Sequence, residues 1–207
     1  VLHHFSATTA DSTTGLLENA DGATPLGGLV DGGDGNFYGV TAQGGTEGNG
    51  VIFAMPADGS TFTVLHSFTG ANGARPVAEL LVASSGKLYG ATSSGGVNAE
   101  GATTALGTIF SIDRAGTGFA RLYSFDGKNG SVPSSRLLET APGVFVGVAT
   151  GTGNCGYGTV FRYSLAGDTV TGNTRCGQKK NNSGGGSAGF AVLLLFAGLG
   201  LLRRRAT

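Results

Sequence analysis

The sequence has 207 residues, of which 40 are Gly and only 13% are charged, and its formal net charge is zero. Proteins that bind nucleic acids normally present a basic face, so this charge balance argues against a nucleic-acid partner. Many short apolar runs, separated by Gly, Asn, Asp and Ser, are typical of an all-β domain and unlike a disordered chain.

Read in chain order, the sequence consists of tandem blocks that each contain four short apolar segments. Residues 1–5 correspond to the last segment of an earlier block. The segments of the first block are residues 25–29, 36–41, 50–53 and 62–68. Those of the second block are residues 76–80, 87–92, 107–110 and 119–125. The third block has residues 133–137, 144–149 and 158–161, then a much less apolar fourth segment at 170–176.

Segments of about five residues match the length of β-strands, and a leading Pro is tolerated where a strand begins. Four strands in a repeat of about 50 residues form one blade of a β-propeller, whose apolar faces only neighbouring blades cover. We therefore predict an all-β, propeller-like array of three repeats, at about residues 6–68, 69–125 and 126–176. An ordinary closed propeller has about four to eight blades, so we expect a partial one.

Three further expectations concern the array. Gly39, Gly90 and Gly147 recur inside the second segment of each block, where a missing side chain lets backbones pack closely. Because the fourth segment of the last block is weak, we hypothesise that residues 1–5 complete that blade if the array closes on itself. Insertions within residues 6–24 and 93–106 are expected to form surface loops.

The motifs recur in a fixed order: Leu/Phe-Tyr-Gly-x-Thr, Gly-Gly, Gly-Thr-Ile/Val-Phe, Leu-His-Ser-Phe and Asn-Gly-Ala-x-Pro. Over roughly residues 1–170 this order resembles the GloVer tandem repeat of bacterial surface proteins. The third block departs from it, because Val146 replaces Tyr and the final Leu-x-x-Phe is missing. The resemblance implies a propeller-like fold and export, and it implies no catalytic residues.

The composition changes abruptly at residue 177. Residues 177–187 form a polar, Gly-rich spacer that ends in Gly184, Gly185, Gly186 and Ser187. Residues 188–202 carry no charge and are followed by Arg203, Arg204 and Arg205. We predict that residues 188–205 form a transmembrane helix whose Arg cluster stays cytoplasmic, which places the repeats outside the membrane. A buried core helix is the alternative.

A Gly-rich motif, a short apolar helix and a terminal Arg cluster together resemble the GlyGly-CTERM sorting signal of Gram-negative bacteria. The resemblance implies a rhomboid-family protease, rhombosortase, as partner. Gly weakens the start of a helix, and local unwinding exposes a peptide bond to such a protease. A permanent anchor without cleavage is the alternative. Because the chain starts at Val1 without an export signal, we expect it to be the C-terminal part of a longer precursor.

Few residues are candidates for chemistry. Cys155 and Cys176 close a loop of about 20 residues, which in an exported protein favours a disulfide worth about 3 kcal/mol, with two free thiols as the alternative. His3 and His66 share a block position that holds Tyr123 in the next block, so we interpret it as a half-buried structural slot.

The acidic turns are weaker candidates. Asp31, Asp34 and Asn36 could ligate Ca²⁺ through oxygen atoms, but the spacing of an EF-hand is absent. We interpret these residues as turn formers. The sequence thus predicts no catalytic, cofactor-binding or metal site.

These features favour a non-catalytic repeat domain on the surface of a Gram-negative cell. We expect adhesion or ligand recognition, with glycans or other surface polymers as the candidate class. One alternative is an accessory propeller of a secreted hydrolase or lyase. Another is a propeller enzyme, against which the scarcity of His and the absence of acidic pairs at matching block positions argue.

Overall fold

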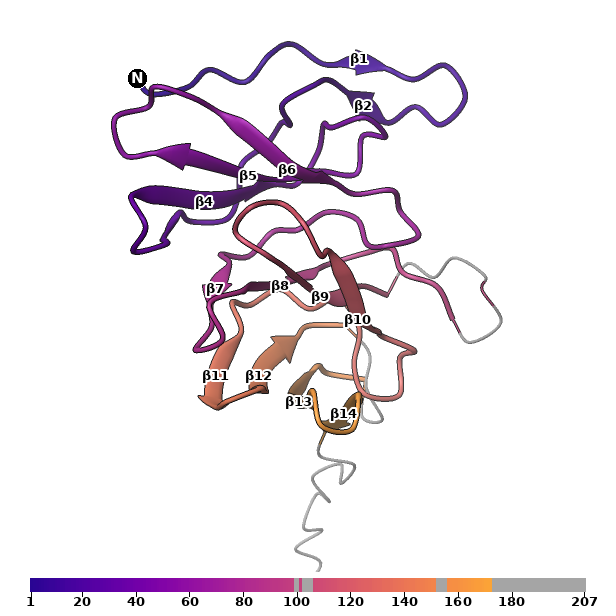
Figure 1. Cartoon of the computed structure of the whole chain (residues 1–207). Coiled ribbons are helices and arrows are strands. Elements are labelled where there is room, and N and C mark those ends of the chain that lie inside the picture. Colours follow the sequence, from indigo (N-terminus) through magenta and orange to yellow (C-terminus); the bar gives the residue numbers. More distant parts are fainter. Residues whose placement is uncertain (99–100, 102–105, 152–155, 173–207) are drawn as a thin grey trace, which may run out of the picture. The chain divides into compact units, whose positions relative to one another are not determined.

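A computed structural model of the chain describes residues 1–98, 101, 106–151 and 156–172, all within one compact unit, Val1–Cys176. The described residues form a small hairpin and three four-stranded antiparallel sheets that follow one another along the chain (Figure 1). The hairpin comprises β1 (Thr9–Ala10) and β2 (Leu17–Glu18). The first sheet comprises β3 (Val30–Asp31), β4 (Asn36–Thr41), β5 (Val51–Pro56) and β6 (Thr63–Ser67). The second comprises β7 (Leu81–Val82), β8 (Leu88–Thr92), β9 (Thr108–Ile112) and β10 (Ala120–Ser124). The third comprises β11 (Leu138–Ala141), β12 (Val144–Ala149), β13 (Thr159–Ser164) and β14 (Thr169–Gly172).

Each sheet is one sequence block, and its strands pair in chain order. The prediction of an all-β array of four-stranded repeats is therefore confirmed. Aromatic and β-branched residues fill the middle strands, as in the run Asn-Phe-Tyr-Gly-Val-Thr of β4, and such side chains suit a pleated surface. The ends of the strands are fixed by Asx turns, for example where the amide of Gly33 donates to the carboxylate of Asp31 at 2.8 Å.

The first strand of each sheet begins later than the sequence predicted. We expected strands at residues 25–29, 76–80 and 133–137, whereas β3, β7 and β11 begin just after these segments. Each segment opens with a Pro, which has no N–H to pair, and the preceding residue has a φ of 58°, 55° or 56° at Thr24, Arg75 and Val132. A left-handed residue followed by Pro breaks the strand pairing there.

These Pro-led segments contact their neighbours in the next repeat. A Cβ atom on Gly27 would lie 3.0 Å from the carbonyl oxygen of Ala78. One repeat further on, the guanidinium of Arg136 lies 2.9 Å from the carboxylate of Glu79. The segments therefore join successive sheets side by side instead of adding a strand to either.

The hypothesis that residues 1–5 complete the last sheet is wrong. These residues form no strand, and their rings pack on the first sheet. The third sheet has its own fourth strand, β14, which pairs with β13 between Arg162 and Thr171 and between Tyr163 and Val170. The polar segment after Asp168 is thus a strand despite its low apolar content.

The apolar core of the described residues consists of two clusters, and each lies between two consecutive sheets. One cluster joins Val30, Tyr38, Val40, Ile52 and Phe68 of the first repeat to Leu80, Leu88, Phe110 and Ile112 of the second. The other joins Leu81, Tyr89, Ile109 and Phe125 to Leu137, Phe145, Phe161 and Tyr163 of the third repeat. The second sheet is therefore covered on both faces, which explains why all residues of β8 and β9 are buried.

The recurring glycines make room for a side chain, not for a neighbouring backbone as expected. A Cβ atom on Gly39, Gly90 or Gly147 would lie 2.5 Å from the ring of Phe53, Phe110 or Phe161, respectively. Of the two insertions, residues 6–24 carry the exposed β1–β2 hairpin, and residues 93–106 lie partly outside the described residues.

Candidate functional site

A repeated aromatic arrangement joins the end of each block to the next sheet. The imidazole of His66 stacks on Phe119, with ring centroids 3.6 Å apart, and Phe68 meets Phe110 edge-on at 5.2 Å. The same arrangement occurs upstream, where His3 stacks on Phe62 at 3.8 Å and Phe5 meets Phe53 at 5.9 Å. Residues 1–5 therefore do for the first sheet what the end of the first block does for the second.

Each stacked ring is also hydrogen-bonded at its polar tip. The side chain of Asn72 lies 3.1 Å from Nε2 of His66, and Asp21 lies 3.0 Å from Nε2 of His3. Tyr123, at the same block position, is hydrogen-bonded to the side chain of Asn129, although its ring is tilted against Tyr163 and does not stack on it. Burial lowers the pKa of His66 and raises that of Tyr123, so both rings are neutral at pH 7. The structure thus confirms that this position is a half-buried structural slot.

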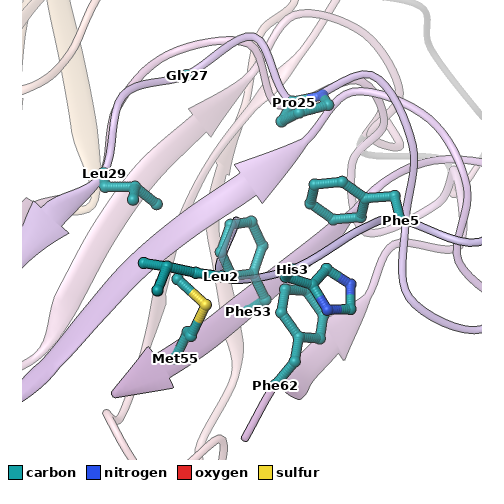
Figure 2. Close-up of a pocket in the computed structure, with 9 residues that line it drawn as sticks. All are labelled: Leu2, His3, Phe5, Pro25, Gly27, Leu29, Phe53, Met55 and Phe62. Atoms are coloured by element: carbon teal, nitrogen blue, oxygen red, sulfur yellow. The ribbon is translucent and has the colours of Figure 1, made fainter. Parts of the chain in front are cut away.

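The leading face of the first sheet carries an apolar hollow of about 350 Å³. We use the term leading face for the side of the first sheet that bears Leu29, Phe53 and Met55. Figure 2 shows the hollow between these side chains and the N-terminal segment. It is lined by Leu2, His3, Phe5, Pro25, Gly27, Leu29, Phe53, Met55 and Phe62. Its only ionisable side chain is His3, which is bonded to Asp21, so the hollow suits an apolar partner and not acid–base chemistry.

The trailing face, at the other end of the array, is also apolar. This face of the third sheet bears Leu138, Val146, Val148 and Val160, which are cross-strand neighbours on β11, β12 and β13, and the exposed Arg162 lies opposite Val146. Leu138 and Val160 are each 64% exposed. A shallow hollow beside them is lined by residues that include Tyr157 and Val148. Both ends of the array therefore present apolar surface.

The acidic turns stabilise the scaffold. Asp34 accepts a hydrogen bond from the hydroxyl of Tyr38 at 2.7 Å and one from the amide of Asn36 at 3.1 Å. Arg114 of the second repeat lies 3.6 Å from the same carboxylate. Burial, together with the bond to Asp34, raises the pKa of Tyr38 to about 12. Within the part of the chain that the structure describes, no three His, Cys, Asp or Glu side chains are grouped as metal ligands.

Several predicted residues lie outside the described ranges. They are Cys155 and Cys176, the motif Gly184, Gly185, Gly186 and Ser187, the cluster Arg203, Arg204 and Arg205, and the anchor segment 188–205. Among the residues that the structure does describe, no helix is long and apolar enough to cross a membrane.

A contact between Pro and Gly that joins each pair of sheets was not predicted from the sequence. Pro76 packs on Gly50, where a Cβ atom would lie 2.9 Å from the proline ring, and Pro133 packs on Gly107 at 2.6 Å. Backbone bonds run beside them, from the amide of Arg75 to the carbonyl of Asn49 at 2.9 Å, for example. Both residues recur at fixed block positions, which could have marked them as important. Their contact could not be predicted, because it joins residues of different blocks and the repeat period does not show which positions meet.

No curated protein matches the chain. TolB from Acinetobacter baumannii aligns with a TM-score of 0.45 at 16% identity, over 72% of this chain and 31% of TolB. The tricorn protease aligns with a TM-score of 0.39 at 12% identity, over 70% of this chain and 12% of that chain. This chain thus spans less than a third of TolB and a smaller part of the tricorn protease.

The family model of the Gloeobacter/Verrucomicrobia repeat matches residues 3–182 and so covers all three blocks. This is the GloVer repeat that the motifs resembled. The chain therefore belongs to the Gloeobacter/Verrucomicrobia repeat family.

Proposed function

We propose that the repeat array is a non-catalytic binding module, exported and displayed on the surface of a Gram-negative cell. The observation that carries the proposal is the contrast between repeated sheets and unlike loops. The loops between the second and third strands share a base, in which Gly50 donates to Gly44 at 2.9 Å and Gly107 donates to Gly95 at 3.0 Å. Beyond that base they differ in length and sequence.

The differing loop tips are residues 46–49, 97–106 and 152–157. The strands that flank these loops are equivalent in the three sheets, so all three loops begin and end at the same ends of the strands. A rigid scaffold that presents unlike loops on one edge is the usual architecture of a binding surface. Thr, Asn, Glu and Tyr in these loops supply polar groups and one aromatic ring, which suit a polar polymer such as a glycan.

The titratable side chains support a role without catalysis. His66 is stacked and hydrogen-bonded within a seam between sheets, and Asp34 is held by a tyrosine and a backbone amide. A general base needs a lone pair that faces substrate, and these groups are already engaged by the scaffold.

A glycan array tests the ligand class. The full chain is expected to bind a subset of surface polysaccharides, and replacing residues 97–106 with the sequence of residues 46–49 is expected to abolish or redirect that binding. Thr117→Glu, in the turn at the opposite edge of the second sheet, is the matched control and should leave binding unchanged. Absence of binding to any glycan would refute this ligand class.

The tail adds a proposal about processing. We infer that Gly184, Gly185, Gly186 and Ser187 form the site at which a rhombosortase-type protease cuts, and that residues 188–205 hold the precursor in the membrane until then. Mass spectrometry of the mature C-terminus distinguishes the outcomes. A C-terminus near residue 187 supports cleavage, whereas a protein that still ends at Thr207 supports a permanent anchor.

A further inference from the structure

The trailing face of the third sheet is equivalent to surfaces that the other two sheets bury. Val160 occupies the block position of Ile52 and Ile109, and both isoleucines are completely buried between sheets. Leu138 likewise takes the position of Val30 and Leu81, which are buried as well. Burying such side chains contributes about 25 cal/mol for each Å² removed from water, so this exposed face is built for a further sheet.

The leading face of the first sheet is the other half of the same kind of seam. Leu29 occupies the position of Leu80 and Leu137, which are at most 1% exposed, yet Leu29 is 49% exposed. In the second and third sheets the equivalent residues pack on the preceding sheet. The hollow beside Leu29 is therefore the space that the trailing face of a preceding sheet fills within the array (Figure 2).

The backbone hydrogen bonds that join consecutive sheets, which we call a seam, involve block positions that also occur at the two ends of the array. Within the array, Arg75 and Val132 donate to the carbonyls of Asn49 and Leu106 at 2.9 and 2.8 Å. The position of Asn49 and Leu106 is held in the third block by Tyr157, which is 95% exposed. On the leading side, Thr24 and Pro25 repeat the left-handed residue and proline that enter each seam.

The two ends are also complementary in their aromatic side chains, because the third block ends without the His and Phe that the first sheet already receives from residues 1–5. In the array, a sheet receives the stacked His and Phe from the end of the preceding block, as the second sheet receives His66 and Phe68. The third block has no final Leu-x-x-Phe to contribute. The first sheet needs none, because His3 and Phe5 already occupy those places.

We propose that two copies of this chain associate head to tail, with the trailing face of each third sheet docked on the leading face of the other copy's first sheet. The two seams are identical, and the proposal requires that their rotation close after two copies, which gives a two-fold ring and not an open filament. The described residues of two copies supply six four-stranded sheets, which falls within the range of about four to eight that closed propellers adopt. This proposal does not depend on the proposed binding function.

Sedimentation of the full chain in a mild non-ionic detergent tests the proposal, because the detergent masks the apolar segment 188–202. The expected protein mass is twice the 20.5 kDa of one chain. Val160→Glu places a carboxylate in both seams, and Leu29→Lys places an ammonium in both. Each change should weaken association by at least about 100-fold, whereas the control Thr117→Glu should not.

Mixing the two variants separates this arrangement from other dimers. One heterodimeric seam then has both natural faces, and the other brings the introduced carboxylate opposite the introduced ammonium, so the mixture should regain the dimeric mass. Far-ultraviolet circular dichroism verifies folding, and Leu2→Lys, in the same hollow, replaces Leu29→Lys if that variant does not fold.

Three results would overturn the proposal. The first is a monomeric unaltered chain at about 50 μM, far above the dissociation constant of a standard interface. Such a chain with its hollow open to an apolar dye would indicate that further repeats of a longer polypeptide cover these faces. The second is a dimer that neither variant dissociates. The third is a mixture of the variants that stays monomeric, which would exclude the head-to-tail arrangement.

Discussion

Replacing Gly90 by Ala tests whether the recurring glycine exists to accommodate a phenylalanine ring. The added Cβ atom would lie 2.5 Å from Cζ of Phe110 and 2.9 Å from Cδ2 of Leu80. Carbon atoms prefer separations of about 3.5 to 4.0 Å, so each neighbour would have to retreat by up to about 1 Å. Neither has room to move, because both side chains are completely buried in the cluster between the first and second sheets.

The magnitude follows from two opposing effects. Overpacking of a close-packed core costs about 1–3 kcal/mol. Removing a glycine restricts the unfolded chain and returns about 0.4–1 kcal/mol, which applies because Gly90 has no positive φ. We therefore expect Gly90→Ala to lower the free energy of unfolding by about 1–2 kcal/mol.

Urea unfolding followed by far-ultraviolet circular dichroism measures this change. Gly167→Ala is the matched control, because its Cβ atom would meet only Thr169, at an ordinary 3.5 Å. A double variant that combines Gly90→Ala with Phe110→Leu should be less destabilised than the sum of the single changes, by about 1 kcal/mol. Equal effects of Gly90→Ala and Gly167→Ala, or strictly additive effects in the double variant, would refute the steric explanation.

Three other predictions concern stability. Burial lowers the pKa of His66 from its ordinary 6.5, so the unfolded chain takes up the proton more readily than the folded chain does. The contribution of neutral His66 to stability is therefore complete above about pH 6.5 and is lost as the pH falls toward the folded pKa. His66→Tyr, which introduces the residue type that Tyr123 supplies one block later, should flatten this dependence in urea titrations at about pH 5 and pH 8, and an unchanged slope would contradict the assignment. Val132→Asn should raise the free energy of unfolding by about 1 kcal/mol, and with it the urea midpoint, because Asn tolerates the φ of 56° better than Val does. A lower midpoint would show that the packing of the valine side chain matters more than the strain of its backbone. If Cys155 and Cys176 are paired, reduction should destabilise the oxidised protein by about 3 kcal/mol, and peptide mapping without reductant should find the linked peptides; two alkylated thiols would exclude the bond.

The strands inside the sheets could be predicted from sequence because their signal is local. Residues 36–41 and 144–149 were predicted as strands and are strands with those bounds. Alternating aromatic and β-branched side chains mark them without reference to the rest of the fold. The first strands were misplaced because apolar character was read as pairing, whereas the segments after Pro25, Pro76 and Pro133 contact neighbouring repeats through their side chains.

The role of residues 1–5 could not be derived from one block alone. The sequence showed that His3 and Phe5 match the end of a block, and this correctly identified them as a displaced repeat segment. It did not show that such residues cover the following sheet instead of completing their own, because that depends on contacts between blocks. The candidate faces were missed for the same reason, since Leu29 and Leu80 look alike in sequence and differ in how far contacts between blocks bury them.

Because the rings of His66 and Phe68 pack on the second sheet, each block carries at its end the cover of the sheet that follows it. Unequal crossing-over within the gene can therefore change the number of sheets without disturbing a seam. Excision of residues 66–122 would join Leu65 directly to Tyr123. Tyr123 would then take the position of His66 at the end of the first block, and its ring would still face the third sheet. Loss of a whole period therefore keeps a ring at this position wherever the deletion starts, whereas truncation of the chain at a block boundary removes the rings that cover the sheet that follows.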